Sequence, residues 1–221
     1  MKQRISTISF LTIQLILYYL ILTASGELLV ASCYSAIVVC FLYALIHFKR
    51  YDPLILAGLL FTLAADYFLV VCSPIRQLWG MLCFTVTQTL YAIRLHIENK
   101  NKWILYLRSC LIAVAEVATV IILKDKLDAL AVVSVCYYAN LIVNIVTAFS
   151  TFRKNRLFTI GLVLFLLCDT VIGLQVAANA YLPIAEGSLL YRIIFMDFFL
   201  SWFFYLPSQV LIALNGLRKD I

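Results

Sequence analysis

The sequence predicts an all-α integral membrane protein with eight transmembrane helices. Of the 221 residues, 65% are hydrophobic and only 13% are charged, and the mean hydropathy is +1.03. A soluble domain of this size could not bury so much apolar surface, so most of that surface must face lipid. Backbone groups in lipid must find hydrogen-bond partners within their own segment, which favours helices. The alternating ten-residue segments of a β-barrel are not seen.

Eight apolar runs mark the predicted spans, each near the roughly 20 residues that a helix needs to cross a bilayer. Their approximate limits are 8–24, 28–48, 53–72, 77–95, 103–123, 127–151, 157–178 and 193–214. The connections are short, so residues 1–221 are expected to form a single membrane domain. The N-terminus resembles the start of a signal peptide, but no small-residue cleavage site with a polar segment follows it. We therefore expect the first run to remain as a span.

Lys and Arg are unevenly divided between the two sides of this predicted topology. Of the 17 Lys and Arg residues, 13 fall on the side of the two termini, and the other four are Arg76, Lys124, Lys126 and Arg192. Such residues accumulate on the cytoplasmic side of membrane proteins. We therefore expect both termini in the cytoplasm and an even number of spans. The net charge of +6 is then a topology signal and not a nucleic-acid-binding surface.

The cysteines and histidines give no sign of a metal site or a disulfide framework. The seven Cys are scattered singly in or beside apolar runs, and no CxxC pair occurs. This distribution is typical of small buried apolar residues. Neither of the two His has a Cys or a second His at metal-ligand spacing. We expect no cofactor and no metal.

Two carboxylates lie inside apolar runs in matched settings. Asp66 ends the string GLLFTLAAD and Asp169 ends GLVLFLLCD, so a Gly-Leu pair begins eight residues before each of them. A lone carboxylate in hydrocarbon is costly, which makes each a candidate functional residue. Two nearby carboxylates in a low dielectric would not both ionise easily, leaving an acid beside a base. The alternative is that each is a structural residue bonded to a neighbouring helix.

The span after each carboxylate carries a matched amide. The strings FTVTQTL and YLPSQVL align around Gln88 and Gln209, which predicts two parallel repeats of four helices each. Tyr91 shares a helix face with Gln88, and Tyr205 shares one with Gln209. All four are candidate substrate-binding residues. The alternative is that they form hydrogen bonds between helices.

Two further polar residues in the predicted spans are candidate cavity residues. Asn140 belongs to a stripe at helical spacing that must face protein or water, formed by Tyr137, Asn140, Asn144 and Thr147. Glu116 is a third intramembrane acid. We include both among the candidate substrate-binding residues.

Together these motifs resemble the YhhN or lysoplasmalogenase family of eight-span membrane proteins. That family carries a pattern like G-L-x-F-S-x-x-G-D in the third span and F-x-x-x-H-x-x-Y in the fourth. The seventh span has G-x-x-x-F-x-x-S-D-[ST]-x-x-x-x-N, and the last has Y-x-x-A-Q-x-L-I-A. This chain matches with GLLFTLAAD, with Phe84 and Tyr91, with the segment from Gly161 to Thr170, and with YLPSQVLIA, in that order over most of 54–214.

The chain departs from the family pattern at several positions. The Gly before the first Asp is Ala65, and the fourth-span His is Gln88; in the seventh span a Ser is Cys168 and an Asn is Gln175. An imidazole can exchange protons at neutral pH, whereas an amide cannot. Gln88 therefore favours an alternative in which the chain keeps the scaffold and binds a lipid or another small molecule without catalysis.

The resemblance implies hydrolysis of the vinyl ether bond of lysoplasmalogens, giving a fatty aldehyde and a glycerophospho-head group. Asp66 and Asp169 would share the roles of acid and base, as the paired carboxylates of glycosidases do, and no metal is required. The expected partner is a lysophospholipid-like substrate in a bacterial plasma membrane. A secondary transporter is a third possibility, suggested by the parallel repeat and the intramembrane acids.

Overall fold

The computed structural model describes residues 2–124, 127–180, 185, 187–195 and 199–217, and nearly all of them are helical. The long helices are α1 Lys2–Thr23, α2 Gly26–Ile46, α3 Pro53–Asp66, α4 Gln77–Asn99, α5 Lys102–Leu123, α6 Ala129–Ser150, α7 Arg156–Ala180 and α9 Leu200–Asn215. The short ones are the 3₁₀ turn η1 Phe48–Arg50, the π-helical turn η2 Tyr67–Val71 and α8 Leu189–Ile194. The prediction of an all-α fold is confirmed for the described residues.

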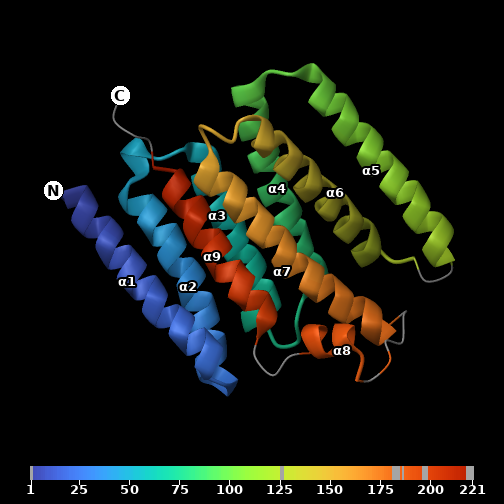
Figure 1. Ribbon diagram of the computed structural model, residues 1–221, viewed down its shortest axis with the longest axis horizontal. Coiled ribbons are helices and arrows are strands. Elements are labelled where there is room, and N and C mark those ends of the chain that lie inside the picture. Colours follow the sequence, from blue (N-terminus) through green and yellow to red (C-terminus); the bar gives the residue numbers. More distant parts are fainter. Residues whose placement is uncertain (1, 125–126, 181–184, 186, 196–198, 218–221) are drawn as a thin grey trace.

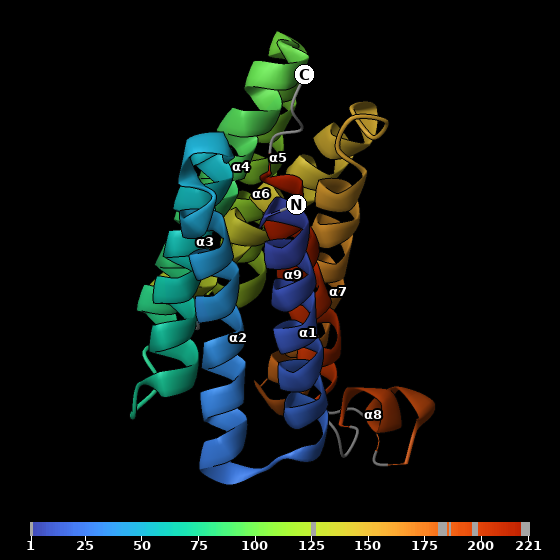
Figure 2. The ribbon, with the colours of Figure 1, turned by 90° about the vertical axis from the view of Figure 1, so that its left-hand side faces the viewer.

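Six of the helices form a closed ring, and two pack outside it. Around the ring, α2 contacts α3, α3 contacts α4, α4 contacts α6, α6 contacts α7, α7 contacts α9, and α9 contacts α2. Helix α1 packs on α2 at one edge of the molecule and α5 packs on α6 at the other (Figures 1 and 2). The inside of the ring is therefore the place where polar side chains of several helices can meet.

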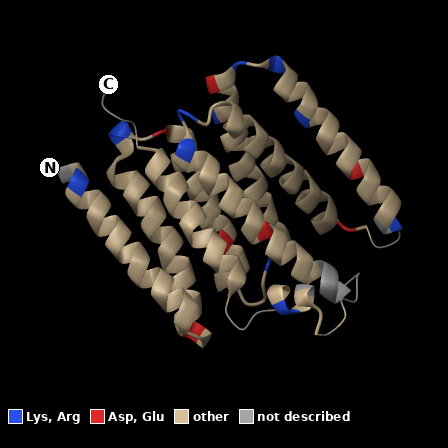
Figure 3. Ribbon diagram, in the orientation of Figure 1, with Lys and Arg blue, Asp and Glu red and all other residues tan. Residues whose placement is uncertain are grey.

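Successive long helices run in opposite directions. Helix α1 begins and α9 ends at the same end of the bundle (Figures 1 and 2). The connections η1, α4–α5 and α6–α7 lie at that end and carry Lys and Arg, as Figure 3 shows; we call it the basic end. Three residues counted in the predicted charge asymmetry, Lys126, Arg218 and Lys219, lie outside the described residues.

Among the described residues, six helical segments are long and apolar enough to span a membrane: Gln3–Thr23, Gly26–Ile46, Pro53–Val71, Lys102–Ile122, Ala129–Ser150 and Arg156–Val176. Outward-facing apolar side chains, such as Ile8 on α1 and Ile122 on α5, suit contact with lipid tails. The other two predicted spans correspond to α4 and α9. The span expected at 193–214 differs from the structure, in which α8 ends at Ile194 and α9 begins at Leu200. Hydropathy follows side-chain polarity and does not detect where the backbone leaves the helix.

Polar caps fix where several helices begin. Asp52 Oδ1 accepts a hydrogen bond from Leu54 N at 2.9 Å, and Pro53 occupies the first turn of α3. Asn101 and Asp128 cap α5 and α6 in the same way. Such residues satisfy backbone N–H groups that have no partner inside the helix. The boundaries of these three helices could therefore be read from the sequence.

Helix α9 continues through Pro207, although proline lacks the amide that an α-helix requires. The carbonyl four residues earlier belongs to Phe203. Tyr18 of α1 donates its hydroxyl proton to that carbonyl oxygen at 3.2 Å. A phenol from the outer helix thus takes the place of the amide that Pro207 cannot supply.

The two glycines that open the matched motifs allow close contacts between helices. A Cβ atom at Gly161 of α7 would lie 2.8 Å from Ile212 Cγ1 and 3.1 Å from the backbone oxygen of Ser208, both on α9. A Cβ atom at Gly58 of α3 would lie 2.4 Å from the Tyr91 ring on α4. The shared Gly therefore has a packing role in both α3–α4 and α7–α9.

We expect Gly161→Ala to destabilise the protein relative to Gly173→Ala. Both changes gain helix propensity, but an added Cβ at Gly173 meets nothing within 4 Å. Overpacking at Gly161 should cost about 1–3 kcal/mol. Thermal or denaturant unfolding of the two purified variants in detergent measures the difference. Equal stability would show that the α7–α9 contact is not tight.

Candidate functional site

Asp66 is buried and bonded to a tyrosine from the other half of the chain. It is 3% exposed and is the last residue of α3 before the π-helical turn Tyr67–Val71. Tyr205 Oη of α9 donates to Asp66 Oδ2 at 2.7 Å. π-helical turns within helices are frequent at functional sites because they redirect side chains. The π turn was not predicted, since no residue pattern specifies it.

Asp169 has a matching partner on a different helix. Tyr137 Oη of α6 donates a short hydrogen bond to Asp169 Oδ2 on α7. One residue further along each helix, the hydroxyl groups of Tyr138 and Thr170 are 2.7 Å apart. Asp169 is only half-buried, whereas Asp66 is enclosed. The two acids therefore have the same kind of partner and different access from outside.

The two Tyr–Asp pairs share one aromatic cluster. The ring centroid of Phe165 lies 5.4 Å from that of Tyr205 and 6.4 Å from that of Tyr137. Phe84 of α4 lies 5.5 Å from Phe165 and completes the cluster. Tyr205 bonds Asp66 and Tyr137 bonds Asp169, so both acids lie beside this cluster. The ring of helices thus brings together two acids that are about a hundred residues apart in sequence.

Two buried amides lie one helical turn, about 6 Å, closer to the basic end than these rings. Gln209 follows Tyr205 by four residues, and neither its Oε1 nor its Nε2 has a hydrogen-bond partner among the described residues. Gln88 follows Phe84 by four residues; its Oε1 accepts from Asn144 Nδ2 at 2.9 Å, while its Nε2 has no described partner. Leaving such a group unsatisfied costs about 1–3 kcal/mol, which points to water or a ligand here.

An intramembrane arginine organises the polar stripe of α6. Arg108 of α5 donates from Nη1 to Asn140 Oδ1 and from Nη2 to Asn144 Oδ1, both at 2.8 Å. Asn144 in turn donates a hydrogen bond to Gln88, so the Asn144 side chain links the guanidinium group of Arg108 to Gln88. Asn140 is engaged by Arg108 and not by either Asp. The sequence analysis counts Arg108 only with the Lys and Arg that indicate topology. It lies inside the predicted span 103–123, and an ionisable residue inside a span is a sign of a functional site.

Tyr91 and Glu116 lie away from the two acids. Tyr91 is fully buried nearer the basic end, where its ring packs edge-on against Phe158 with centroids 5.2 Å apart. Glu116 is half-buried on the outer helix α5. Of the predicted site residues, the structure therefore gathers Asp66, Asp169 and Tyr205, with Gln88 and Gln209 one turn away.

The described residues contain no group of three His, Cys, Asp or Glu suited to hold a metal ion. A pocket of about 740 Å³ lies at the basic end, and none of the predicted site residues lines it. The site around Asp66 and Asp169 is instead defined by its hydrogen bonds, its ring contacts and its unpaired amides.

We expect Tyr205→Phe to lower the free energy of unfolding by about 1–3 kcal/mol, because it leaves a buried carboxyl group without its donor. Tyr137→Phe should cost less, since Asp169 is half-buried. Tyr19→Phe is the control, because Tyr19 is 67% exposed; its effect should stay within about 0.5 kcal/mol. Denaturant unfolding in detergent compares the three, and equal effects would argue against these bonds.

Comparison with known proteins agrees with the resemblance that the motifs indicate. The pattern of the YhhN family matches residues 27–216, which is most of the chain. The comparisons with curated proteins and with solved structures each gave no match. The matched region contains α2 to α9 and therefore both Tyr–Asp pairs. The chain belongs to the YhhN family.

Proposed function

We propose that the protein is a lysoplasmalogenase-like hydrolase, which cleaves the vinyl ether bond of lysoplasmalogens. The observation that carries this proposal is the pair of Tyr-bonded carboxyl groups, Asp66 and Asp169, on one buried aromatic cluster. Vinyl ether hydrolysis needs an acid and a base near each other in a site with little water, and no cofactor. The family membership supports the same reaction class.

The proposed reaction has three steps. One carboxyl group gives its proton to the vinyl carbon, which leaves an oxocarbenium ion. The other carboxylate takes a proton from a water molecule as that water adds to the ion, forming a hemiacetal. The hemiacetal then breaks its bond to the glycerol oxygen, which receives the hydroxyl proton, and the products are a fatty aldehyde and the glycerophospho-head group.

The surrounding groups fit this chemistry. In both pairs the phenol bonds Oδ2, which leaves Oδ1 for a proton or a water molecule. The unpaired amides of Gln88 and Gln209 could bind water or the glycerol hydroxyl. Tyr91, Asn140 and Glu116 remain candidates for contacts with a longer substrate. Asp169 is less enclosed than Asp66, so we place the entry of the substrate on its side.

We also propose that the helical bundle consists of two parallel four-helix repeats in a bacterial plasma membrane, with eight spans and both termini cytoplasmic. In this proposal α1, α2, α3 and α4 correspond to α5, α6, α7 and α9. The contacts between neighbouring helices correspond as well: α2 packs on α3 as α6 packs on α7, and α3 packs on α4 as α7 packs on α9. The basic end would then face the cytoplasm. The two acids lie where the halves meet, as binding sites between repeats often do.

A second candidate function is binding of a lipid without hydrolysis. The observation that favours it is Gln88, whose amide takes the place of the family histidine and is bonded to Asn144. An amide cannot exchange a proton at neutral pH. The aromatic cluster and the unpaired amides would still form a binding site.

We expect Asp66→Asn and Asp169→Asn each to reduce aldehyde release from lysoplasmalogen by at least about 100-fold, the contribution typical of one acid–base group. Release is measured with purified protein in detergent. Glu27→Gln is the matched control, because Glu27 is exposed at the start of α2. Full activity in both Asn variants would contradict the proposed roles.

If the parent protein is inactive, a binding measurement distinguishes lipid binding without hydrolysis from the absence of both functions. If it releases no aldehyde but lysoplasmalogen raises its melting temperature, and Asp66→Asn lowers that shift, the binding function is supported. Neither release nor a shift would reject both functions.

We expect Gln88→His to increase aldehyde release by about tenfold or more, because a second group that exchanges protons near neutral pH would join the site. The rate should then depend on pH near 6–7, where an imidazole titrates. Gln88→Asn is the control and should not gain activity. An unchanged rate in Gln88→His would show that the amide does not limit catalysis.

A further inference from the structure

The pocket at the basic end has a charged lining. It opens where α3 and α7 begin and where α4 and α9 end, and its volume of about 740 Å³ is within the range of small-molecule sites. Its charged residues are four basic and two acidic: Arg94, Arg153, Lys154, Arg156, Asp52 and Glu98. The lining therefore carries a net positive charge.

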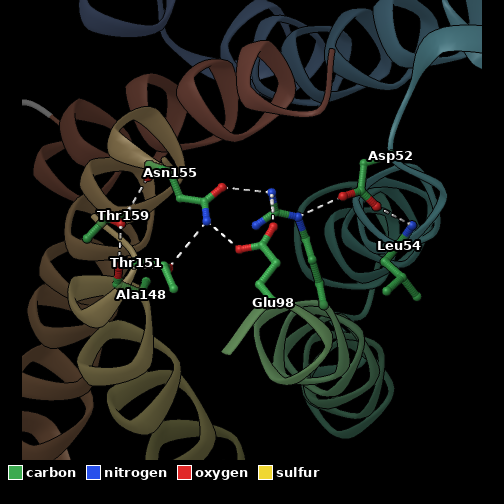
Figure 4. A network of polar contacts seen from close by, with 8 residues as sticks. Asp52, Leu54, Glu98, Ala148, Thr151, Asn155 and Thr159 are labelled. Atoms are coloured by element: carbon green, nitrogen blue, oxygen red, sulfur yellow. Dashed lines mark hydrogen bonds and ion pairs between the residues drawn. The ribbon is translucent and has the colours of Figure 1, made fainter. Parts of the chain in front are cut away.

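Arg94 forms the floor of this pocket and is 6% exposed. Its Nε donates to Asp52 Oδ2 at 2.8 Å and its Nη2 donates to Asn155 Oδ1 at 2.9 Å (Figure 4). Its guanidinium carbon lies 4.6 Å from the ring centroid of Phe158. The buried Nη1 has no hydrogen-bond partner among the described residues. A guanidinium group carries five N–H donors, so Arg94, which lines the pocket, keeps an unused donor.

Both acidic residues of the pocket are occupied in holding this arginine. Asp52 bonds Arg94 through Oδ2 and caps α3 through Oδ1. Glu98 lies 3.1 Å from Arg94 Nη2 and accepts a short hydrogen bond from Asn155 Nδ2 (Figure 4). The frame is also tied to α9, because Asp52 N donates to Gly216 O at 2.8 Å. The guanidinium group is therefore positioned before any ligand arrives.

The rim of the pocket carries basic side chains that form no ion pair with the described residues. Arg153, Lys154 and Arg156 are exposed, and within the described part of the chain they form no ion pair. They stand where α7 begins, and the first turn of a helix presents backbone N–H groups and the positive end of its dipole. The Asn155 side chain, which could cap α7, is bonded to Glu98 and Arg94 instead. Anions are bound at helix starts of this kind.

We propose that this pocket binds a phosphate group, either free phosphate or the phosphomonoester head group of a membrane lipid. Phosphate oxygens accept several charge-assisted hydrogen bonds at once, and a guanidinium group matches that geometry. The unpaired Nη1 of Arg94, the start of α7 and the three rim cations supply those donors.

This site is separate from the carboxylate pair and does not rest on the proposed hydrolysis. The 14 residues of α3 separate Asp52 from Asp66, which is about 21 Å at the rise of an α-helix. Only a glycerol backbone lies between the vinyl ether and the phosphate of a lysoplasmalogen. One substrate molecule therefore cannot reach both places.

The test measures binding to the purified full-length chain in detergent. Inorganic phosphate is titrated by calorimetry, and phosphatidic acid is compared with phosphatidylcholine by the shift in melting temperature. The variant Arg153→Gln/Lys154→Gln/Arg156→Gln changes only exposed rim residues. Its matched control, Arg4→Gln/Lys49→Gln/Lys102→Gln, removes three exposed charges at the same end outside this pocket. We expect the rim variant to bind at least about tenfold more weakly and the control to stay within about twofold.

Each outcome decides the proposal. Phosphate binding that is lost in the rim variant assigns a site for the free anion, and a shift with phosphatidic acid alone assigns a lipid head group. Equal loss in the rim variant and the control would overturn the proposal in favour of diffuse charge attraction. No binding of either probe by the parent protein would also overturn it. Aldehyde release does not enter this test, so its outcome is independent of the hydrolase proposal.

Discussion

Every polar group inside a membrane-embedded bundle needs a partner from the bundle itself, and this requirement shapes the structure. The Asp66 and Asp169 carboxyl groups each receive a tyrosine hydroxyl from another helix. Arg108 finds two asparagine side chains on α6. Tyr18 supplies the donor that Pro207 cannot give to α9. In each case a hydrogen bond between helices both satisfies a polar group and fixes how those helices pack.

Against this background the unsatisfied groups are informative. Two amide atoms of Gln209 and one of Gln88 have no partner among the described residues, and both side chains lie one helical turn from the aromatic cluster that the two Tyr–Asp pairs share. At the basic end, Arg94 has a nitrogen without a partner among the described residues and lines a pocket with excess positive charge. In both places the described residues leave a buried polar group without a partner. They differ in character: one is apolar and deep, while the other is charged and close to the ends of the helices.

Much of the helical framework could be predicted from the sequence. The caps Asp52, Asn101 and Asp128 mark helix starts within a residue or two, and the apolar runs mark the helices that follow. The matched Gly and Asp positions indicated equivalent roles for α3 and α7, and both glycines do lie in tight interhelical contacts. The site was predicted less completely. The sequence places Tyr137 in a polar stripe but does not show that it bonds Asp169. It places Arg108 among the charges that indicate topology but does not show its bonds to α6. Both pairings depend on which helix faces meet.

The sequence by itself determined the all-α class, the approximate helix limits and the pair of acids worth attention. These follow from local chemistry: the cost of polar groups in lipid, the preference of caps for helix starts and the steric role of glycine. Only the tertiary structure decided which helices form the ring, which tyrosine holds which aspartate, and that α8 and α9 are separate. It also brought the basic side chains of α4 and of the start of α7 into one pocket. Such contacts join residues far apart in the chain, and spacing along a sequence does not specify how helices rotate and pack against one another.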